Sequence, residues 1–283
     1  MGRRIVTAES GTEAQPSGSV LRSVERHRSE TQKQISDHIA EEVPVAFVYN
    51  GQPFAVMMST PADFEDFALG FALSEGIVKN ASEFALESVE RLLEGIEIRI
   101  SIPESRQQAL ESRKRSLSGR SGCGICGSEL LEAALRQPAA VGPGIRISPI
   151  ALHRALTGLR AAQPLNDRTG ATHAAGWADA QGRIALVRED VGRHNALDKL
   201  IGAMLRAGHD PQTGFLVVTS RASYEMAMKA ASVGISLMAA ISAPTALAIS
   251  LAERTQLTLI GFARDDGYAV YTHPQRLHAG DDE

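Results

Sequence analysis

Residues 215–262 read FLVVTSRASYEMAMKAASVGISLMAAISAPTALAISLAERTQLTLIGF. Three apolar runs in this stretch alternate with two segments of helical periodicity. Alternation of strand and helix is typical of a parallel sheet joined by right-handed crossovers. We therefore expect three parallel strands at the centre of an α/β domain. The runs are 215–218, 237–241 and 257–262, and the helical segments are 223–232 and 244–253.

The sequence before this stretch extends the same domain. Two further helices, the second with Asp190 as its predicted N-cap, enclose two strands joined by a Gln181-Gly182 turn. Together these elements predict a three-layer α/β domain over residues 145–283. The helices are 149–162 and 191–205, and the strands are 172–178 and 184–187.

The first hundred residues predict a smaller N-terminal α+β domain at 35–102. Asn50-Gly51 between two β-type runs is a hairpin signal. Thr60-Pro61 has the pattern of an N-cap followed by a first-turn proline, and the helix should end at Gly76. The strands expected here are 45–49, 54–58 and 95–102. Residues 1–34 are polar and are expected to form a mobile tail, with ordered structure beginning near Val43.

Residues 103–144 comprise a long polar, basic segment at 103–128, which contains the only two cysteines of the chain, and a linking helix. Cys123 and Cys126 lie in SGCGICGS at 121–128. Neighbouring glycines let a partner approach the sulfur, while upstream cations and a helix start at Ser128 favour the thiolate. The sequence therefore indicates an exposed, activated nucleophilic sulfur. The cations are Arg113, Lys114, Arg115 and Arg120.

Other uses of the cysteine pair stay open. Zinc needs four ligands and one CxxC supplies two, so a zinc ion would have to be shared between two chains. A dithiol redox couple uses the same spacing. A structural disulfide would close too short a loop to stabilise the fold much.

Composition excludes several classes of function. The net charge of −4 over 283 residues gives no basic field for nucleic acid. The longest apolar stretches are broken by Ser and Pro and are too short to span a membrane. No apolar signal region follows Arg3-Arg4, so we expect a cytoplasmic protein whose cysteines stay reduced.

Loops that follow the three parallel strands should meet at one edge of the sheet, where α/β proteins bind ligands. Two of these loops, 219–223 and 242–245, lead into helix N-termini, whose N–H groups suit phosphate. Arg221 in the first loop can add a charge-assisted bond to phosphate. The simpler, structural interpretation is that Ser220, Ser223 and Thr245 only cap helix N-termini.

The third loop, Phe262 to Gly267, reads FARDDG. Arg264 can bind phosphate, and Asp265 or Asp266 can accept hydrogen bonds from a guanine-type edge. The loops thus predict an anion or nucleotide pocket at this edge.

The segment DVGRHNALDK at 190–199 is the densest polar cluster. His194 is a candidate proton shuttle or ligand-binding residue, although a histidine at a helix start is often a structural hydrogen-bonding group. His173 carries the same ambiguity. Asp198 and Lys199 can equally be a solvated helix face.

With these motifs in view, residues 43–277 resemble the FdhD family, the accessory sulfurtransferases of formate dehydrogenases. The resemblance implies that sulfur passes from a cysteine desulfurase, as a persulfide, to the bis-guanine-dinucleotide molybdenum cofactor. It implies Cys123 as the persulfide carrier and Cys126 as an assisting residue. It also places the cofactor-binding segment on Phe262, Ala263, Arg264, Asp265, Asp266 and Gly267. The matching motifs are GCGICG at 122–127, TGATHAA at 169–175, EDVGRHNALDK at 189–199, TSRASYEM at 219–226 and YTHPQRL at 271–277.

The resemblance further implies a C-terminal domain similar to cytidine deaminases, which raises zinc deamination as a second function. At the comparable helix starts, His194-Asn195-Ala196 and 220–223 lack the general-acid glutamate and both ligand cysteines. No catalytic zinc is therefore expected. A non-catalytic cofactor chaperone and a dithiol redox protein are two further candidate functions. A cofactor with two guanine ends suits a homodimer with two pockets.

Overall fold

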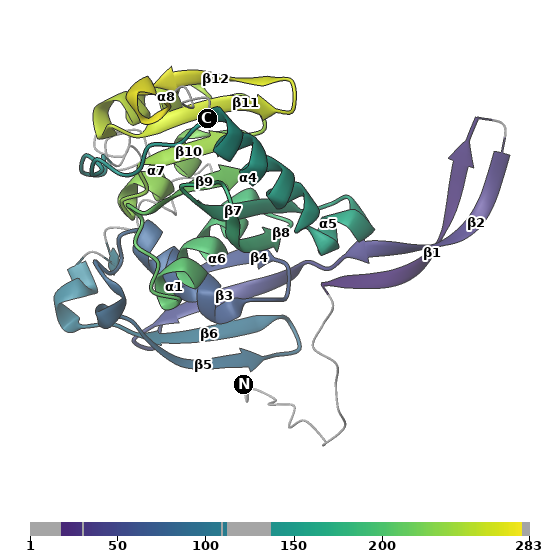
Figure 1. Cartoon of the computed structure of the whole chain (residues 1–283). Helices are drawn as coiled ribbons and strands as arrows, with labels where there is room; N and C mark the ends of the chain where they lie inside the picture. Colours follow the sequence, from purple (N-terminus) through teal and green to yellow (C-terminus); the bar gives the residue numbers. More distant parts are fainter. Residues whose placement is uncertain (1–17, 30, 109, 112–136, 279–283) are drawn as a thin grey trace.

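A computed structural model describes residues 18–29, 31–108, 110–111 and 137–278 of the chain (Figure 1). A six-stranded sheet with helices on both faces forms the larger body. A four-stranded sheet with one helix packs beneath it, and a two-stranded hairpin projects from the side. The fold is therefore α/β with a smaller N-terminal α+β part, as the sequence predicts.

The six-stranded sheet has the order β12-β11-β10-β9-β7-β8. β9, β10 and β11 are parallel neighbours, which confirms the expectation from the three apolar runs. β12 pairs antiparallel with β11 and was not predicted. The strands are β7 (His173–Asp179), β8 (Ile184–Asp190), β9 (Gly214–Val218), β10 (Leu237–Ala240), β11 (Thr258–Arg264) and β12 (Gly267–Thr272).

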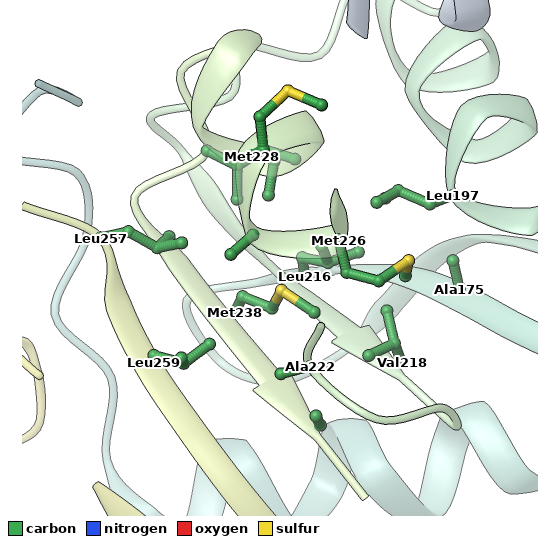
Figure 2. Close-up of a cluster of buried hydrophobic side chains, with 14 of the residues drawn as sticks. Ala175, Leu197, Leu216, Val218, Ala222, Met226, Met228, Met238, Leu257 and Leu259 are labelled. Atoms are coloured by element: carbon green, nitrogen blue, oxygen red, sulfur yellow. The ribbon is translucent and has the colours of Figure 1, made fainter. Parts of the chain in front are cut away.

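Helices cover both faces of this sheet because strand residues alternate between two core clusters. α4 packs on one face. α6, α7 and α8 pack on the other face, where side chains of α7 meet those of β9, β10 and β11 (Figure 2). The short helix α5 was not predicted. The helices are α4 (Pro149–Ala161), α5 (Pro164–Thr169), α6 (Arg193–Arg206), α7 (Tyr224–Ser232) and α8 (Ala246–Thr255), and a 3₁₀ turn, η3 (Pro274–Arg276), follows β12.

The N-terminal sheet has the order β4-β3-β6-β5, and its helix α1 lies between this sheet and α6. Phe47 of β3 stacks on Phe71 and meets the edge of Phe67, both from α1. The alternating strand β5 was not predicted. The elements are β3 (Val43–Tyr49), β4 (Gln52–Ser59), α1 (Phe64–Ser74), η1 (Ala81–Glu83), β5 (Ala85–Arg91), β6 (Ile96–Ser101) and η2 (Glu104–Arg106).

The prediction of a mobile tail is wrong for residues 19–29 and 31–34, and ordered structure begins well before Val43. β1 (Ser19–Arg28) and β2 (Thr31–Ala40) pair antiparallel along their whole length. The backbone ladder forms despite the polar composition, because a strand needs only its neighbour for hydrogen bonds. Residues 1–17 lie outside the described part.

Two predicted helix caps are also wrong. α1 begins at Phe64, and its N-cap residue is Asp63, which makes no side-chain cap bond. The Thr60 hydroxyl instead accepts a hydrogen bond from the amide of Val191, at 3.1 Å. α6 has Gly192 as its N-cap, because Asp190 is committed to the contact between the two halves of the chain.

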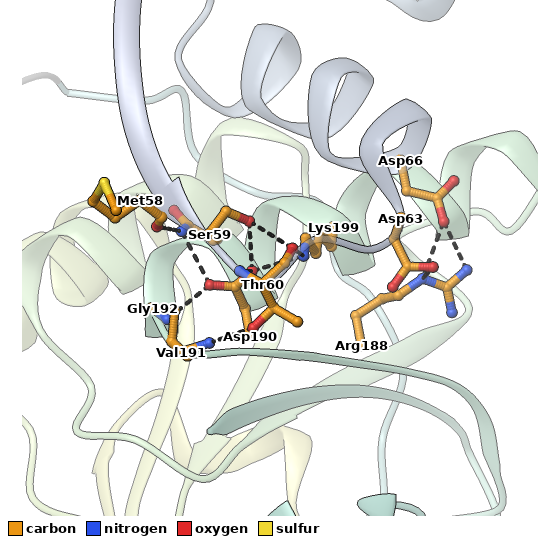
Figure 3. A network of polar contacts seen from close by, with 11 residues as sticks. Met58, Ser59, Thr60, Asp63, Asp66, Arg188, Asp190, Val191, Gly192 and Lys199 are labelled. Atoms are coloured by element: carbon orange, nitrogen blue, oxygen red, sulfur yellow. Dashed lines mark hydrogen bonds and ion pairs between the residues drawn. The ribbon is translucent and has the colours of Figure 1, made fainter. Parts of the chain in front are cut away.

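Buried charges join the two halves (Figure 3). Asp190 accepts hydrogen bonds from Ser59 and Thr60 at 2.7 and 3.0 Å, and pairs with Lys199 at 2.7 Å. The Lys199 ammonium also donates to the Thr60 carbonyl at 2.9 Å. Asp198 and Lys199 are both 0% exposed, so the interpretation of a solvated helix face is wrong.

No helix within the described ranges is long and apolar enough to cross a membrane.

Candidate functional site at the carboxyl edge of the sheet

The three predicted loops lie side by side at the carboxyl ends of β9, β10 and β11. Ala222 forms a bridge with Pro244, which joins the first loop to the second. The amide of Phe262 donates to the carbonyl of Ser242 at 3.2 Å and joins the second loop to the third. The structure therefore assembles one continuous edge from segments some twenty residues apart.

The third loop forms a shallow hollow of about 360 Å³. Phe262 has the left-handed φ of 52° and is 46% exposed, an unusual state for a large apolar side chain. The preceding Gly261 lies so close to Pro244 that a Cβ there would come within 2.7 Å of the proline ring. Phe262 and Tyr268 line the hollow together. The hollow is lined by Phe262, Arg264, Asp266, Gly267, Tyr268 and Ala269.

The structure separates the two aspartates that the sequence left equivalent. Asp265 pairs with Arg160 of α4 at 3.0 Å and does not line the hollow. Asp266 lines the hollow and has no hydrogen-bond or ion-pair partner in the described part of the chain. Arg264 also lines it and donates from Nε to the Ile241 carbonyl at 3.3 Å.

Ala263 is the exception among the predicted cofactor-binding residues. Its side chain is fully buried in the core beneath α4, because β11 alternates between the core and the edge. Any contact of Ala263 with a ligand would therefore come from its backbone.

A second polar cluster lies where α6 and α7 begin. His194 of α6 and Glu225 of α7 face each other, with 3.0 Å between Nε2 and Oε2, which is an ion pair only with a protonated imidazole. His173, at the start of β7, is half-buried; burial together with nearby Arg193 and His194 lowers the pKa of His173. His173, Arg193 and His194 therefore share one neighbourhood, which favours the neutral form of His173.

The serines of the first loop are not simple helix caps. Ser223 occupies the N-cap position of α7 but makes no side-chain cap bond, and its hydroxyl is buried without a hydrogen-bond partner in the described ranges. The Nε atom of Arg193 is likewise buried without a hydrogen-bond partner in the described ranges. Ser220 is buried and donates to the carbonyl of Arg221, whose side chain is exposed. Thr245 alone acts as a cap, accepting from the amide of Ala248 at 3.3 Å.

Sequence reasoning missed several residues of this edge. Glu225 stands in the quoted motif at 219–226 but only its contact with His194 reveals a role. Tyr268 and Arg160 come from elements that carry no local signal of a site. Cys123 and Cys126 lie outside the described residues. Within the described ranges, no three His, Cys, Asp or Glu side chains gather in a way that could hold a metal ion.

Fold and site together define a three-layer α/β protein whose candidate site residues gather at the carboxyl edge of its parallel strands. The chain belongs to the FdhD/NarQ family, which matches residues 40–278.

Its relatives include the sulfur carrier protein FdhD of Xanthomonas campestris pv. campestris (strain B100). The two are 60% identical over 275 residues, which cover 97% of this chain and 98% of that relative. The sulfur carrier protein FdhD of Cupriavidus necator is 52% identical over 241 residues, or 85% of this chain and 84% of its own length.

A crystal structure of a formate dehydrogenase accessory protein from Desulfotalea psychrophila has the same fold. The TM-score is 0.74 at 23% identity, covering 92% of this chain and all of that one.

Proposed function

We propose that this protein is a sulfurtransferase that carries persulfide sulfur from a cysteine desulfurase to the bis-guanine-dinucleotide molybdenum cofactor, for use by formate dehydrogenase. The observation that carries the proposal is the 60% identity, over nearly the whole chain, to a protein named as a sulfur carrier. The only cysteines that can hold the sulfur in this chain are Cys123 and Cys126.

The uptake step is a thiol–persulfide exchange. The Cys123 thiolate attacks the outer sulfur of the desulfurase persulfide, the donor S–S bond breaks, and the donor cysteine leaves as a thiolate. Cys123 then carries the outer sulfur as its own persulfide, with no net oxidation or reduction.

Cys126 assists the release step. Its thiolate attacks Cys123 Sγ, and the outer sulfur leaves as hydrosulfide for the molybdenum centre. The two cysteines are thereby oxidised to a disulfide while the sulfur is reduced, and a thiol reductant restores the pair.

The carboxyl edge of the sheet is proposed to hold the cofactor, which is a substrate here. The hollow beside Phe262 and Tyr268 offers aromatic faces for a guanine, and Asp266 can accept from its N1–H and amino groups. Arg264, Arg221 and the helix start at Ser223 suit the diphosphate. His194, paired with Glu225, adds a further donor at the same edge.

Two further parts of the proposal concern assembly and place. A homodimer would present two guanine pockets to a cofactor with two guanine ends. The cytoplasm would keep both cysteines reduced and available.

The first test is intact-protein mass spectrometry after incubation with a cysteine desulfurase and cysteine. Wild-type protein is expected to gain one sulfur that a reductant removes, and Cys123→Ser to gain none. Cys126→Ser is expected to gain the same sulfur and, in the absence of reductant, to hold it longer than wild type, because it lacks the thiolate that releases it. No gain in the wild type, with the desulfurase shown to be active, would favour a cofactor-binding chaperone or a dithiol redox protein instead.

A second prediction distinguishes the two aspartates of the edge. Asp266→Asn is expected to weaken GDP binding by about tenfold, since an amide cannot accept both guanine hydrogen bonds. Asp265→Asn is the matched control and should stay within about twofold, because it loses only an exposed ion pair with Arg160. Isothermal titration with GDP and ADP measures both. Equal effects of the two variants, or no preference of the wild type for GDP, would refute the assignment of Asp266.

A further inference from the structure

The hairpin of β1 and β2 projects from the body with little to support it (Figure 1). Its sheet has only two strands, so each strand leaves one edge without a strand partner in the described part of the chain. An isolated two-stranded sheet is marginally stable in water, and an open edge is a template for pairing with another strand. The family match begins at residue 40, where the hairpin ends, whereas the Xanthomonas campestris relative matches 97% of this chain.

One face of the hairpin has an apolar stripe. Val20 lies opposite Ile39, and Val24 lies opposite Ile35, all four on the same face. Ile39 is 42% exposed and the other three are half-buried. The stripe therefore presents apolar surface that the hairpin alone does not cover.

The charges on this face are unbalanced. Lys33 lies directly opposite Arg26, a repulsive pair in an antiparallel sheet. Asp37 is the only acid among the described side chains of the face, and it pairs with Arg26 through one oxygen at 2.8 Å. Lys33 has no hydrogen-bond or ion-pair partner in the described ranges. This face therefore lacks an acid beside Lys33.

We propose that β2 pairs edge to edge with β2 of a second copy of this chain, antiparallel and centred on Ile35. A two-fold axis at Ile35 sets Lys33 opposite Asp37 of the partner subunit and Asp37 opposite Lys33 of the partner subunit. Ile35 then meets its own counterpart. Each Lys33 then faces an acid of the other copy. The two hairpins form one four-stranded sheet, in which the two apolar stripes lie side by side.

The second copy is favoured over another protein because β2 is complementary to itself. Residues 33, 35 and 37 share one face, and their order of cation, apolar residue and acid matches its own reversal. The inference rests on the homodimer in the proposed function, for which it names the surface. It is independent of the sulfur chemistry, which the mass measurement tests separately.

The test is a charge swap in the full-length protein, with mass measured by light scattering during gel filtration over a range of concentrations. Lys33→Asp and Asp37→Lys each place like charges across both symmetric contacts, so each should raise the dimer dissociation constant at least about tenfold. The double variant K33D/D37K restores opposite charges between the copies and should recover the dimer. Within one hairpin, Asp at 33 then lies opposite Arg26 while Lys at 37 lies opposite Arg22, so the recovery reports the contacts between the copies.

Two results would overturn the proposal. A wild-type monomer at all concentrations would remove the homodimer together with this surface. A dimer that survives both single reversals would keep the homodimer and place its interface elsewhere, with Lys33 merely guarding an open edge against aggregation.

Disulfide trapping gives a second readout that does not depend on charge. In a C123S/C126S background, Ile35→Cys should form a disulfide-linked dimer under oxidised glutathione, because the two-fold axis sets the residue opposite itself. Ser36→Cys is the control on the other face; it would lie opposite Gln34 of the partner subunit and should not cross-link. Equal cross-linking of both variants would overturn the register.

Discussion

Replacing Lys229 by methionine is expected to lower the free energy of unfolding by about 3–5 kcal/mol. Lys229 is 4% exposed, and its ammonium lies 2.8 Å from both Asp198 and Glu75. It also donates to Ser74 at 3.0 Å and lies over the ring of Phe71. Methionine keeps much of the volume but leaves two buried carboxylates without this cation, and an uncompensated buried charge is costly.

Urea unfolding followed by the fluorescence of Trp177 measures this effect, because Trp177 is the single tryptophan and is 2% exposed. Lys79→Met, at an exposed lysine, is the control and should change stability by less than about 0.5 kcal/mol. Adding Asp198→Asn to Lys229→Met should recover part of the lost stability, because it removes one uncompensated buried charge. Equal stability of the two lysine variants would show that the buried network contributes nothing.

The stability of Lys229→Met is also expected to depend on pH. Burial raises the pKa of Asp198 above its ordinary 3.8, although Lys229 opposes the rise. A carboxyl whose native pKa is raised binds more protons when folded, so stability falls as the pH rises from 3.8 through the native value. Without Lys229 the native pKa of Asp198 should rise further, so the interval over which stability falls should extend toward neutral pH. In the added part of that interval, acidification should stabilise Lys229→Met but not wild type.

This network also shows where sequence reasoning reaches its limit. Apolar periodicity predicted α4, α6, α7, α8 and the three parallel strands, because local pattern determines such elements. Asp198 could be interpreted as solvated because its partner Ser74 is 124 positions away and the contact exists only in the folded chain. A charged residue on a helix gives no local sign of whether another helix will cover it.

Two other differences between the prediction and the structure also arise from contacts that form only in the folded chain. β1 and β2 were not predicted because most of their residues are polar, so they lack the alternating apolar pattern of a half-buried strand. Their strand conformation depends on pairing with one another. At the candidate site, the sequence located the loop from Phe262 to Gly267 but could not rank Asp265 against Asp266. That distinction arises from Arg160 on α4, which the fold brings to one carboxylate and not to the other.

Gly202→Ala is expected to destabilise the protein by about 3 kcal/mol, although alanine is the better helix former. α1 and α6 cross at two glycines. A Cβ on Gly202 would lie 1.9 Å from the carbonyl oxygen of Asp66, and one on Gly70 would lie 1.7 Å from that of Asp198. Backbone atoms cannot rotate away as a side chain can, so the helices must separate and strain the buried hydrogen bond from Ser74 to Asp198 between them.

Gly158→Ala in α4 is the matched control, because there the new Cβ would meet a side chain, that of Ile184 at 2.9 Å, and no backbone atom. Its stability should stay within about 1 kcal/mol of wild type, the size of the gain in helix propensity. Gly70→Ala should resemble Gly202→Ala in the same urea titration. If all three alanines were equally tolerated, the helices would have room to separate, and close contact between α1 and α6 would not be what holds the two halves of the chain together.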